Sequence, residues 1–245
     1  METIRSKANP LVKETKKLHQ KKYRKTAYLI EGWHLLEEAQ KAGAAIEMIF
    51  VTEDQVHRLA DQSLVRLVSP EVLQELADSQ TPQGVVAKVA LPREPLPYQL
   101  EGRYLVLEDV QDPGNVGTMI RTADAAGYDG VFLSDRSADV YNMKVLRAMQ
   151  GSHFHLPIYR GEMGEILKRL QAAGLEVRAT TLSEQSVDYR TLEKKAAFAL
   201  VMGNEGQGIS PSLAAAADQL VHIPMPGQAE SLNVAVAAGI LLFSL

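Results

Sequence analysis

The sequence of 245 residues contains no cysteine, and this absence excludes several classes of protein together. Disulfide scaffolds, thiolate zinc sites, iron–sulfur clusters and cysteine nucleophiles all need a residue that the chain lacks. Long apolar runs are also missing, because the longest, Leu232 to Phe243, has 12 residues against the ~20 that span a bilayer. We therefore expect no transmembrane helix. The N-terminus lacks the apolar core of a secretion signal, so we expect a cytoplasmic protein.

The net charge of the chain is small, but its charged residues are unevenly distributed. The net charge is −4, yet the first 25 residues alone sum to +7. A basic segment on an acidic body is typical of a protein that meets a polyanion, because neutralising phosphates releases counterions. A solvated helix face would have the same composition, and charge alone does not decide between these interpretations.

The first 90 residues alternate between expected helices and strands. Asn9 and Pro10 form a helix start. Strands are expected at 28–30, 46–51 and 84–90, and helices at 33–42 and from Pro70, so this part is predicted to be a small α/β unit. Residues 91–102 contain three prolines, which are typical of an interdomain linker. We therefore place the boundary near residue 95, with domains at 1–95 and 103–245.

The second part has strands that are apolar on both faces. They are expected at 104–108, 131–134, 176–180, 197–202 and 220–223. Helices are expected between them, at 115–126, at 162–173, from 211 and from 231. Strands of this kind, separated by helices, predict a parallel sheet covered on both sides. The predicted fold class of the chain is α/β.

Three loops in this second part contain residues that are able to support chemistry. In the first, Asp112-Pro113-Gly114 forms a turn into a helix that begins around Asn115. An apolar stripe on that helix faces the sheet and leaves Arg121 on the other side, at the edge where ligands of open α/β sheets bind. A capping asparagine and a surface arginine are the alternative interpretation.

The second and third loops are rich in glycine and proline. The second contains Gly203, Gly206 and Gly208 around Glu205. Its G-x-x-G-x-G spacing fits neither the dinucleotide fingerprint nor the phosphate loop, so a Rossmann dehydrogenase and a P-loop enzyme are not supported. The third places Ser231 and its polar neighbours at the start of a small apolar helix, which suits a buried helix or a subunit interface. A simple glycine turn and simple helix capping remain the alternatives.

Taken together, the loops resemble three motifs of one family. The segments N-V-G-T-M-I-R-T-A-D-A-A-G, V-M-G-N-E-G-Q-G-I and I-P-M-P-G-Q-A-E-S-L-N-V-A-V-A-A resemble those of the SpoU/TrmH family of RNA 2′-O-ribose methyltransferases, over residues 103–243. The N-terminal part, with E-G-W-H-L-L-E-E-A and T-P-Q-G-V-V-A-K-V, is similar to the ribosomal-protein-like substrate-binding domain of the rRNA-modifying branch. The resemblance implies a SPOUT catalytic domain with a C-terminal trefoil knot.

The resemblance also implies a cofactor, a partner and site residues. S-adenosylmethionine would bind in the knot, and the protein would be a homodimer whose active site takes Arg121 from one chain. The implied catalytic residues are Asn115, Arg121, Glu205, Ser231 and Asn233. The implied cofactor-binding residues are Thr181, Gly203, Asn204, Gly208, Ile223, Met225 and Leu232.

Methyl transfer from a sulfonium needs no metal and no covalent enzyme intermediate, so positioning and removal of the hydroxyl proton account for most of the catalysis. A guanidinium with a pKa above ~12 is a poor proton acceptor. We therefore expect Arg121 to bind the adjacent phosphate and to stabilise negative charge on the 2′-oxygen. Asn115, Ser231 and Asn233 would orient the ribose and the cofactor, and Glu205 would fix the geometry of its loop or of a donor.

The predicted substrate is structured RNA, most specifically 23S rRNA, because of the extra N-terminal domain. A tRNA methyltransferase and a non-catalytic assembly factor of the same fold are the alternatives. The residues expected to contact RNA are Arg5, Lys7, Lys13, Lys17, Lys21, Lys22, Arg24, Lys144 and Arg147. For the last two basic residues, solvated surface is an equal alternative. His153 and His155 have the spacing of one strand face, but without a nearby acid we expect packing or RNA contact and no metal.

Overall fold

The computed structural model describes residues 2–92 and 99–245, which fold as two compact units. Unit 1 consists of residues 2–92 together with 139–154, and unit 2 consists of residues 99–138 together with 155–245. Residues 93–98, which are half of the predicted linker and include the boundary near residue 95, lie outside the described residues.

Unit 1 is built on a mixed four-stranded sheet. Its strands are β1 (Ala27–Glu31), β2 (Ile46–Thr52), β3 (Val65–Val68) and β4 (Val85–Ala90), in the order β1-β4-β2-β3. Strand β4 is antiparallel to both of its neighbours, whereas β2 and β3 are parallel. The helices are α1 (Pro10–Lys17), α2 (Trp33–Lys41) and α3 (Pro70–Leu76). The predicted α/β unit is confirmed, with β3 as an additional strand.

Local sequence explains where these helices begin. The side chain of Asn9 accepts a hydrogen bond from the Leu11 N–H, and Ser69 caps α3 in the same way. A proline follows each cap, where the missing N–H costs nothing. Residues of α1 and α3 then pack with Leu29 and Phe50 of the sheet in one buried cluster.

Residues 139–154 belong to unit 1, although the sequence predicts that they are part of a domain at 103–245. The segment contains α5 (Met143–Met149) and a 3₁₀ turn, and Met143 is buried in the unit 1 cluster. Asp139 forms an ion pair with Arg24, and His153 contacts the hydroxyl of Tyr28 at 3.1 Å. These contacts join residues that are far apart in the sequence, so no local sequence pattern predicts them.

Unit 2 is built on seven parallel strands. They are β5 (Arg103–Leu107), β6 (Gly130–Ser134), β7 (Ile158–Gly161), β8 (Glu176–Thr180), β9 (Val187–Asp188), β10 (Phe198–Met202) and β11 (Gln219–His222). The order across the sheet is β7-β6-β5-β10-β8-β11-β9, and every neighbouring pair is parallel. Strands β7 and β9 were not predicted, because they are short and only half-buried.

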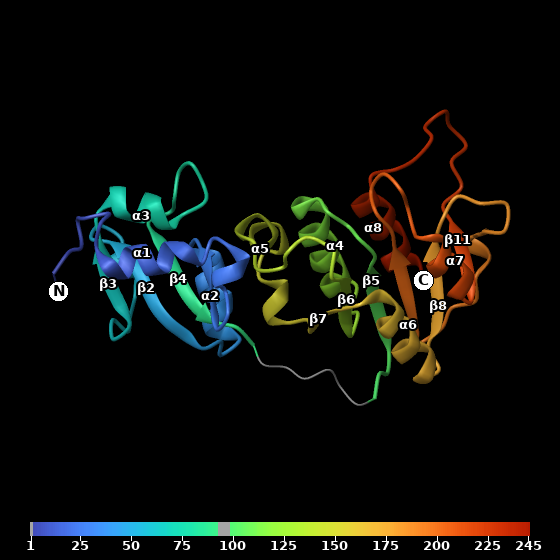
Figure 1. The fold of residues 1–245 in the computed structure, drawn as a ribbon, viewed down its shortest axis with the longest axis horizontal. Coiled ribbons are helices and arrows are strands. Elements are labelled where there is room, and N and C mark those ends of the chain that lie inside the picture. Colours follow the sequence, from blue (N-terminus) through green and yellow to red (C-terminus); the bar gives the residue numbers. More distant parts are fainter. Residues whose placement is uncertain (1, 93–98) are drawn as a thin grey trace. The chain divides into compact units, whose positions relative to one another are not determined.

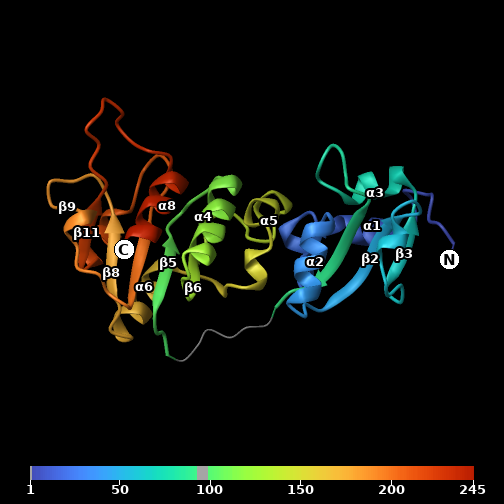
Figure 2. The same cartoon turned by 180° about the vertical axis from the view of Figure 1, so that it is seen from behind.

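Helices cover both faces of this sheet. Helices α6 (Met163–Ala172) and α7 (Pro211–Ala216) pack against Val106, Val177 and Val201 on one face. Helices α4 (Pro113–Ala125) and α8 (Val234–Ser244) pack against the strands from the other face. They lie side by side in both views (Figures 1 and 2). The parallel sheet covered on both sides, and the α/β fold class, are confirmed.

The late strands are inserted between earlier ones. Strand β10 lies between β5 and β8, and β11 lies between β8 and β9. The carboxyl ends of β8, β10 and β11 therefore meet at one edge of the sheet, where the chain order reverses and ligands of open α/β sheets bind. Across residues 2–92 and 99–245, no helix has the length and apolar character needed to cross a membrane.

Replacing Arg24 by Gln should destabilise unit 1 by about 3 kcal/mol, because Asp139 would keep a partly buried charge without its partner. The Arg24 side chain is only 5% exposed, and it also donates to the carbonyls of Leu18 and His19. Urea unfolding followed by circular dichroism measures the change. Lys25→Gln removes the same charge from an exposed neighbour and should cost less than about 0.5 kcal/mol. Equal effects of the two substitutions would contradict a structural role for Arg24.

Candidate active site

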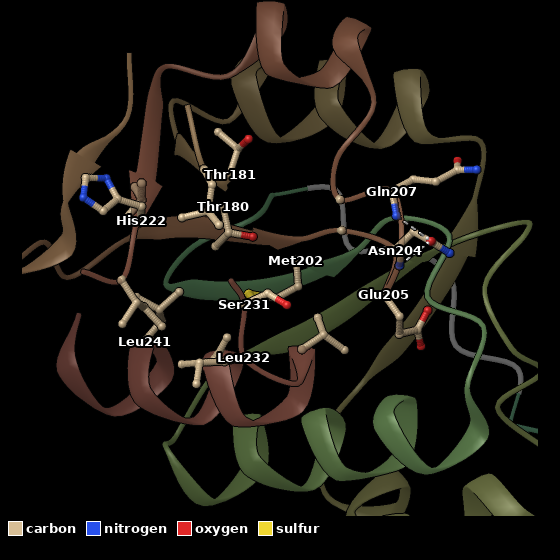
Figure 3. A pocket seen from close by; sticks show the side chains of 18 of the residues that line it. Thr180, Thr181, Met202, Asn204, Glu205, Gln207, His222, Ser231, Leu232 and Leu241 are labelled. Carbon is tan, nitrogen blue, oxygen red and sulfur yellow. Dashed lines mark hydrogen bonds between the residues drawn. The ribbon is translucent and has the colours of Figure 1, made fainter. Parts of the chain in front are cut away.

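A pocket of about 390 Å³ lies where β8, β10 and β11 end, beside α8. Its walls come from the strand ends and from the loops after β10 and β11, which hold the second and third glycine- or proline-rich segments. Figure 3 shows Asn204, Glu205 and Gln207 on one side of the pocket and Leu232 and Leu241 on another. All seven predicted cofactor-binding residues line it, as do Glu205 and Ser231.

The loop after β10 is closed tightly upon itself. Asn204 and Gly208 exchange two backbone hydrogen bonds of 2.9 Å, and the Asn204 side chain accepts from the N–H groups of Gly206 and Gln207. A Cβ on Gly203 would lie 2.2 Å from the backbone carbon of Gly208. Only glycine fits there, so the first glycine of the motif is needed by the loop itself.

The carboxylate of Glu205 joins this loop to the start of α4. It accepts hydrogen bonds from the N–H groups of Gln111 (3.2 Å) and Asp112 (2.9 Å) and from the Asn115 amide (3.2 Å). Partial burial raises the pKa of Glu205, but these hydrogen bonds outweigh it and hold the pKa below its ordinary range. Glu205 is therefore an ionised anchor, in keeping with the predicted role of fixing loop geometry.

A chain of side-chain amides continues from Glu205 to α8. The Asn115 oxygen accepts from the Asn233 amide at 3.0 Å, and Asn233 itself caps α8 by accepting from Ala235 and Val236. The cap of α4 is Asp112, not Asn115, so the alternative of a capping Asn115 is wrong. For Asn233, capping and site contact occur together.

Arg121 lies apart from this pocket. It is exposed on α4 and is absent from the residues that line the pocket. The buried stripe of Val116, Ile120 and Ala123 faces the sheet, as predicted, and leaves Arg121 on the opposite side of the helix. Within the described chain the structure thus brings together four of the five predicted catalytic residues.

Several lining residues were missed by the sequence analysis. Thr180, Met202 and His222 are the last residues of β8, β10 and β11, and Gln207 lies in the closed loop. Leu241 of α8 completes the apolar side. The strand-end residues could have been found from the rule that ligands bind at the carboxyl edge, whereas Leu241 is distant in sequence and carries no signal.

The predicted RNA-contacting residues divide into paired and unpaired groups. Lys7 is held by Glu75, together with Lys16, and Lys17 pairs with Glu14. Arg147 pairs with Asp78 at 2.7 Å. Among the described residues no ion pair forms on Arg5, Lys13, Lys21, Lys22 or Lys144. Arg24 is buried and paired, so its predicted contact with RNA is corrected to a structural role.

The two histidines do not share a strand. His153 belongs to a 3₁₀ turn of unit 1, whereas His155 belongs to unit 2 and lies 3.3 Å from Asp124. The strand interpretation of this pair is wrong, because the i, i+2 spacing also occurs where a turn ends. In the described part of the chain, no three histidine, aspartate or glutamate side chains gather as a metal-binding group.

Comparison with known proteins agrees with this geometry. Residues 102–243 match the SpoU rRNA Methylase family, and residues 9–87 match the MRM3-like substrate binding domain. The chain belongs to the SpoU rRNA methylase family. The resemblance predicted from the three loops is confirmed.

Relatives similar to this chain differ in how much of it they cover. The 23S rRNA (guanosine(2553)-2′-O)-methyltransferase RlmP of Bacillus subtilis is 42% identical, over 100% of this chain and 99% of its own. An AdoMet-bound rRNA methyltransferase from Sinorhizobium meliloti is 37% identical, with a TM-score of 0.90 over 99% of this chain and 96% of its own. The TrmH/SpoU tRNA modifying enzyme of A. aeolicus is 30% identical with a TM-score of 0.53, over 60% of this chain and 74% of its own.

Gly203→Ala should destabilise unit 2 by about 3 kcal/mol, because the added methyl group meets backbone that cannot move without opening the loop. Urea unfolding gives the change. Gly206→Ala in the same loop is the matched control, since its Cβ would have only an ordinary contact at 3.8 Å with Asn204. Similar stabilities of the two variants would show that the loop accommodates a side chain at residue 203.

Glu205→Gln should change how stability depends on pH. Because the pKa of Glu205 is lowered in the folded state, its carboxylate stabilises the fold at neutral pH, and this contribution is lost as the pH falls through the folded-state pKa. Urea midpoints measured between about pH 7 and about pH 3 should be higher for the native chain than for Glu205→Gln at neutral pH. This difference in midpoint should disappear in acid. Glu184→Gln, at an exposed glutamate of the same unit, is the charge-matched control. A difference in midpoint for Glu205→Gln that stays constant across this pH range would rule out the anchoring role.

Proposed function

We propose that this protein transfers a methyl group from S-adenosylmethionine to the 2′-hydroxyl of a ribose in 23S rRNA. The main observation is that the second and third motif loops line one pocket with every residue predicted to bind the cofactor, and that Glu205 joins this pocket to the first motif loop. The relative named as a 23S rRNA enzyme matches over the whole chain, whereas the relative named as a tRNA enzyme matches 60% of it. That difference in coverage supports rRNA over tRNA.

The pocket fits the proposed cofactor in size and chemistry. Its volume lies within the range of about 300–1,000 Å³ that small-molecule sites occupy. Ile223, Leu232 and Leu241 offer apolar surface to a purine ring. Residues 223–232 make no backbone hydrogen bond to the rest of the described chain, so their N–H and C=O groups can serve polar edges of a ligand. When bound, S-adenosylmethionine would supply a methyl group activated by its sulfonium.

The chain's own residues would position the ribose and stabilise the negative charge that develops as its hydroxyl loses a proton. Asn115 and Asn233 are held by their mutual hydrogen bond and by Glu205, so their amides are already oriented. The Arg121 guanidinium, a poor proton acceptor, would stabilise negative charge on the 2′-oxygen. A phosphate oxygen or water would take the proton.

The proposed functional unit is a homodimer in the cytoplasm. Val236 and Phe243 of α8 are large, apolar and exposed, as an interface helix requires. Arg121 lies outside its own pocket, which supports the proposal that it completes the site of a partner chain. The proposal includes the knotted C-terminal half that the family resemblance implies. We assign substrate binding to residues 1–95 and methyl transfer to 103–245, an assignment supported by the two family matches.

Methyl transfer tests this proposal directly. Labelled S-adenosylmethionine and rRNA from cells lacking the modification should yield one 2′-O-methylated nucleotide, located by mapping the resistant ribose. Arg121→Ala should lower kcat/KM by about 100-fold or more, and Arg121→Lys should recover little, because a point charge does not replace the planar guanidinium. RNA and cofactor binding without label transfer would favour the assembly factor, and label found only in tRNA would favour the tRNA branch.

Mixed dimers test whether the site is shared. Arg121→Ala and Asn233→Ala would each inactivate a homodimer by a different half of the site. Mixing equal amounts should recover about a quarter of native activity, because half of the dimers are mixed and each contains one intact site. If activity does not rise on mixing, Arg121 does not act across the dimer.

A further inference from the structure

Unit 1 exposes an aromatic side chain in the middle of its basic segment. Tyr23 ends a 3₁₀ turn, Lys21–Tyr23, that follows α1, and 43% of its surface is accessible. Most aromatic rings of the described chain are buried in the core. An exposed aromatic ring within a basic segment is the combination on which nucleic-acid bases stack.

The backbone around Tyr23 is held in place. The N–H of Tyr23 donates to the Gln20 carbonyl at 3.0 Å, and the N–H of Lys25 donates to the Tyr23 carbonyl at 2.9 Å. On the far side of the turn, the buried guanidinium of Arg24 donates to the carbonyls of Leu18 and His19. The ring thus stands on a pre-organised turn, which lowers the entropy lost on binding.

Positive charge surrounds the ring. The ammonium groups of Lys22 and Lys17 lie 4.9 and 5.8 Å from the ring centroid. Lys21 forms no ion pair among the described residues, and Glu14, paired with Lys17, is the only acidic residue between residues 13 and 25. By contrast, Lys7 and Lys16 are both neutralised by Glu75, so the free charge is concentrated near Tyr23.

We propose that Tyr23 stacks on an unpaired base of the substrate RNA, while Lys21 and Lys22 bind the flanking phosphates. Every base offers a flat face to an aromatic ring, and lysines bind the backbone without reading its sequence. A paired A-form helix keeps its base faces covered, so the surface favours single-stranded or looped RNA. The inference rests on the proposed function only in taking RNA as the partner.

Binding of RNA oligonucleotides to the full-length protein, without cofactor, tests this inference. The probes are a labelled unstructured 12-mer and the same sequence as a duplex, followed by fluorescence anisotropy. Tyr23→Leu should weaken single-strand binding about 10-fold with no change in salt dependence, and it should leave duplex binding alone. Tyr23→Phe keeps the ring and should bind within about two-fold of the native protein.

The contribution of the lysines is tested by the salt dependence of RNA binding. Lys21→Gln should reduce the slope of log K against log salt by about 0.7, the value for one single-strand phosphate. Lys88→Gln removes a surface charge that is paired with Glu47 elsewhere in unit 1 and should leave the slope unchanged. Circular dichroism confirms that each variant is folded.

Two results of the binding assay would overturn the inference: a Tyr23→Leu protein that binds single strands like the native one, or one that loses duplex and single-strand binding equally. Methyl transfer is measured separately, so the two proposals fail separately. Tyr23-dependent binding without methyl transfer leaves this inference standing and removes the proposed function. Methyl transfer with a native kcat/KM in Tyr23→Leu removes this inference alone.

Discussion

The candidate active site depends on one carboxylate that satisfies backbone donors. Glu205 comes from the loop after β10, and the N–H groups that it accepts belong to the approach to α4. Unpaired N–H groups at a helix start attract an anion, and an ionised side chain meets that need at close range. The contact fixes the distance between two loops that are far apart in the chain. The same carboxylate orients the Asn115 amide, and Asn115 in turn orients the Asn233 amide.

The order of strands explains why this contact can form. Since β10 lies directly beside β5, the loops that leave these two strands start next to each other. Gly203 lets the chain fold back immediately after β10, so Glu205 faces the neighbouring loop instead of extending past it. A wider turn at this point would move the carboxylate away from α4. The parallel pairing and the tight turn are therefore both required for the amide chain that reaches α8.

Sequence could predict much of the fold because its signals are local. Strands such as Phe198–Met202 are buried throughout and read as apolar runs, and Asn9 and Ser69 mark helix starts by their own side chains. The candidate site was less predictable. The residues of each loop allowed both a functional and a purely structural interpretation, and the roles of individual side chains came from the family resemblance. Asn115 and Glu205 are 90 residues apart, so no spacing rule joins them. Arg24 was assigned to RNA because composition records charge but not burial.

Unit 1 is made of two separate segments of the chain, and this limits how either unit could be cut out or replaced. The chain passes between the units three times, because residues 139–154 return to unit 1 after the first strands of unit 2. A protein cut at the proline-rich stretch would leave Arg24 without Asp139 and Tyr28 without His153. A catalytic domain that received residues 2–92 would therefore also need a segment that supplies the contacts of Asp139 and His153.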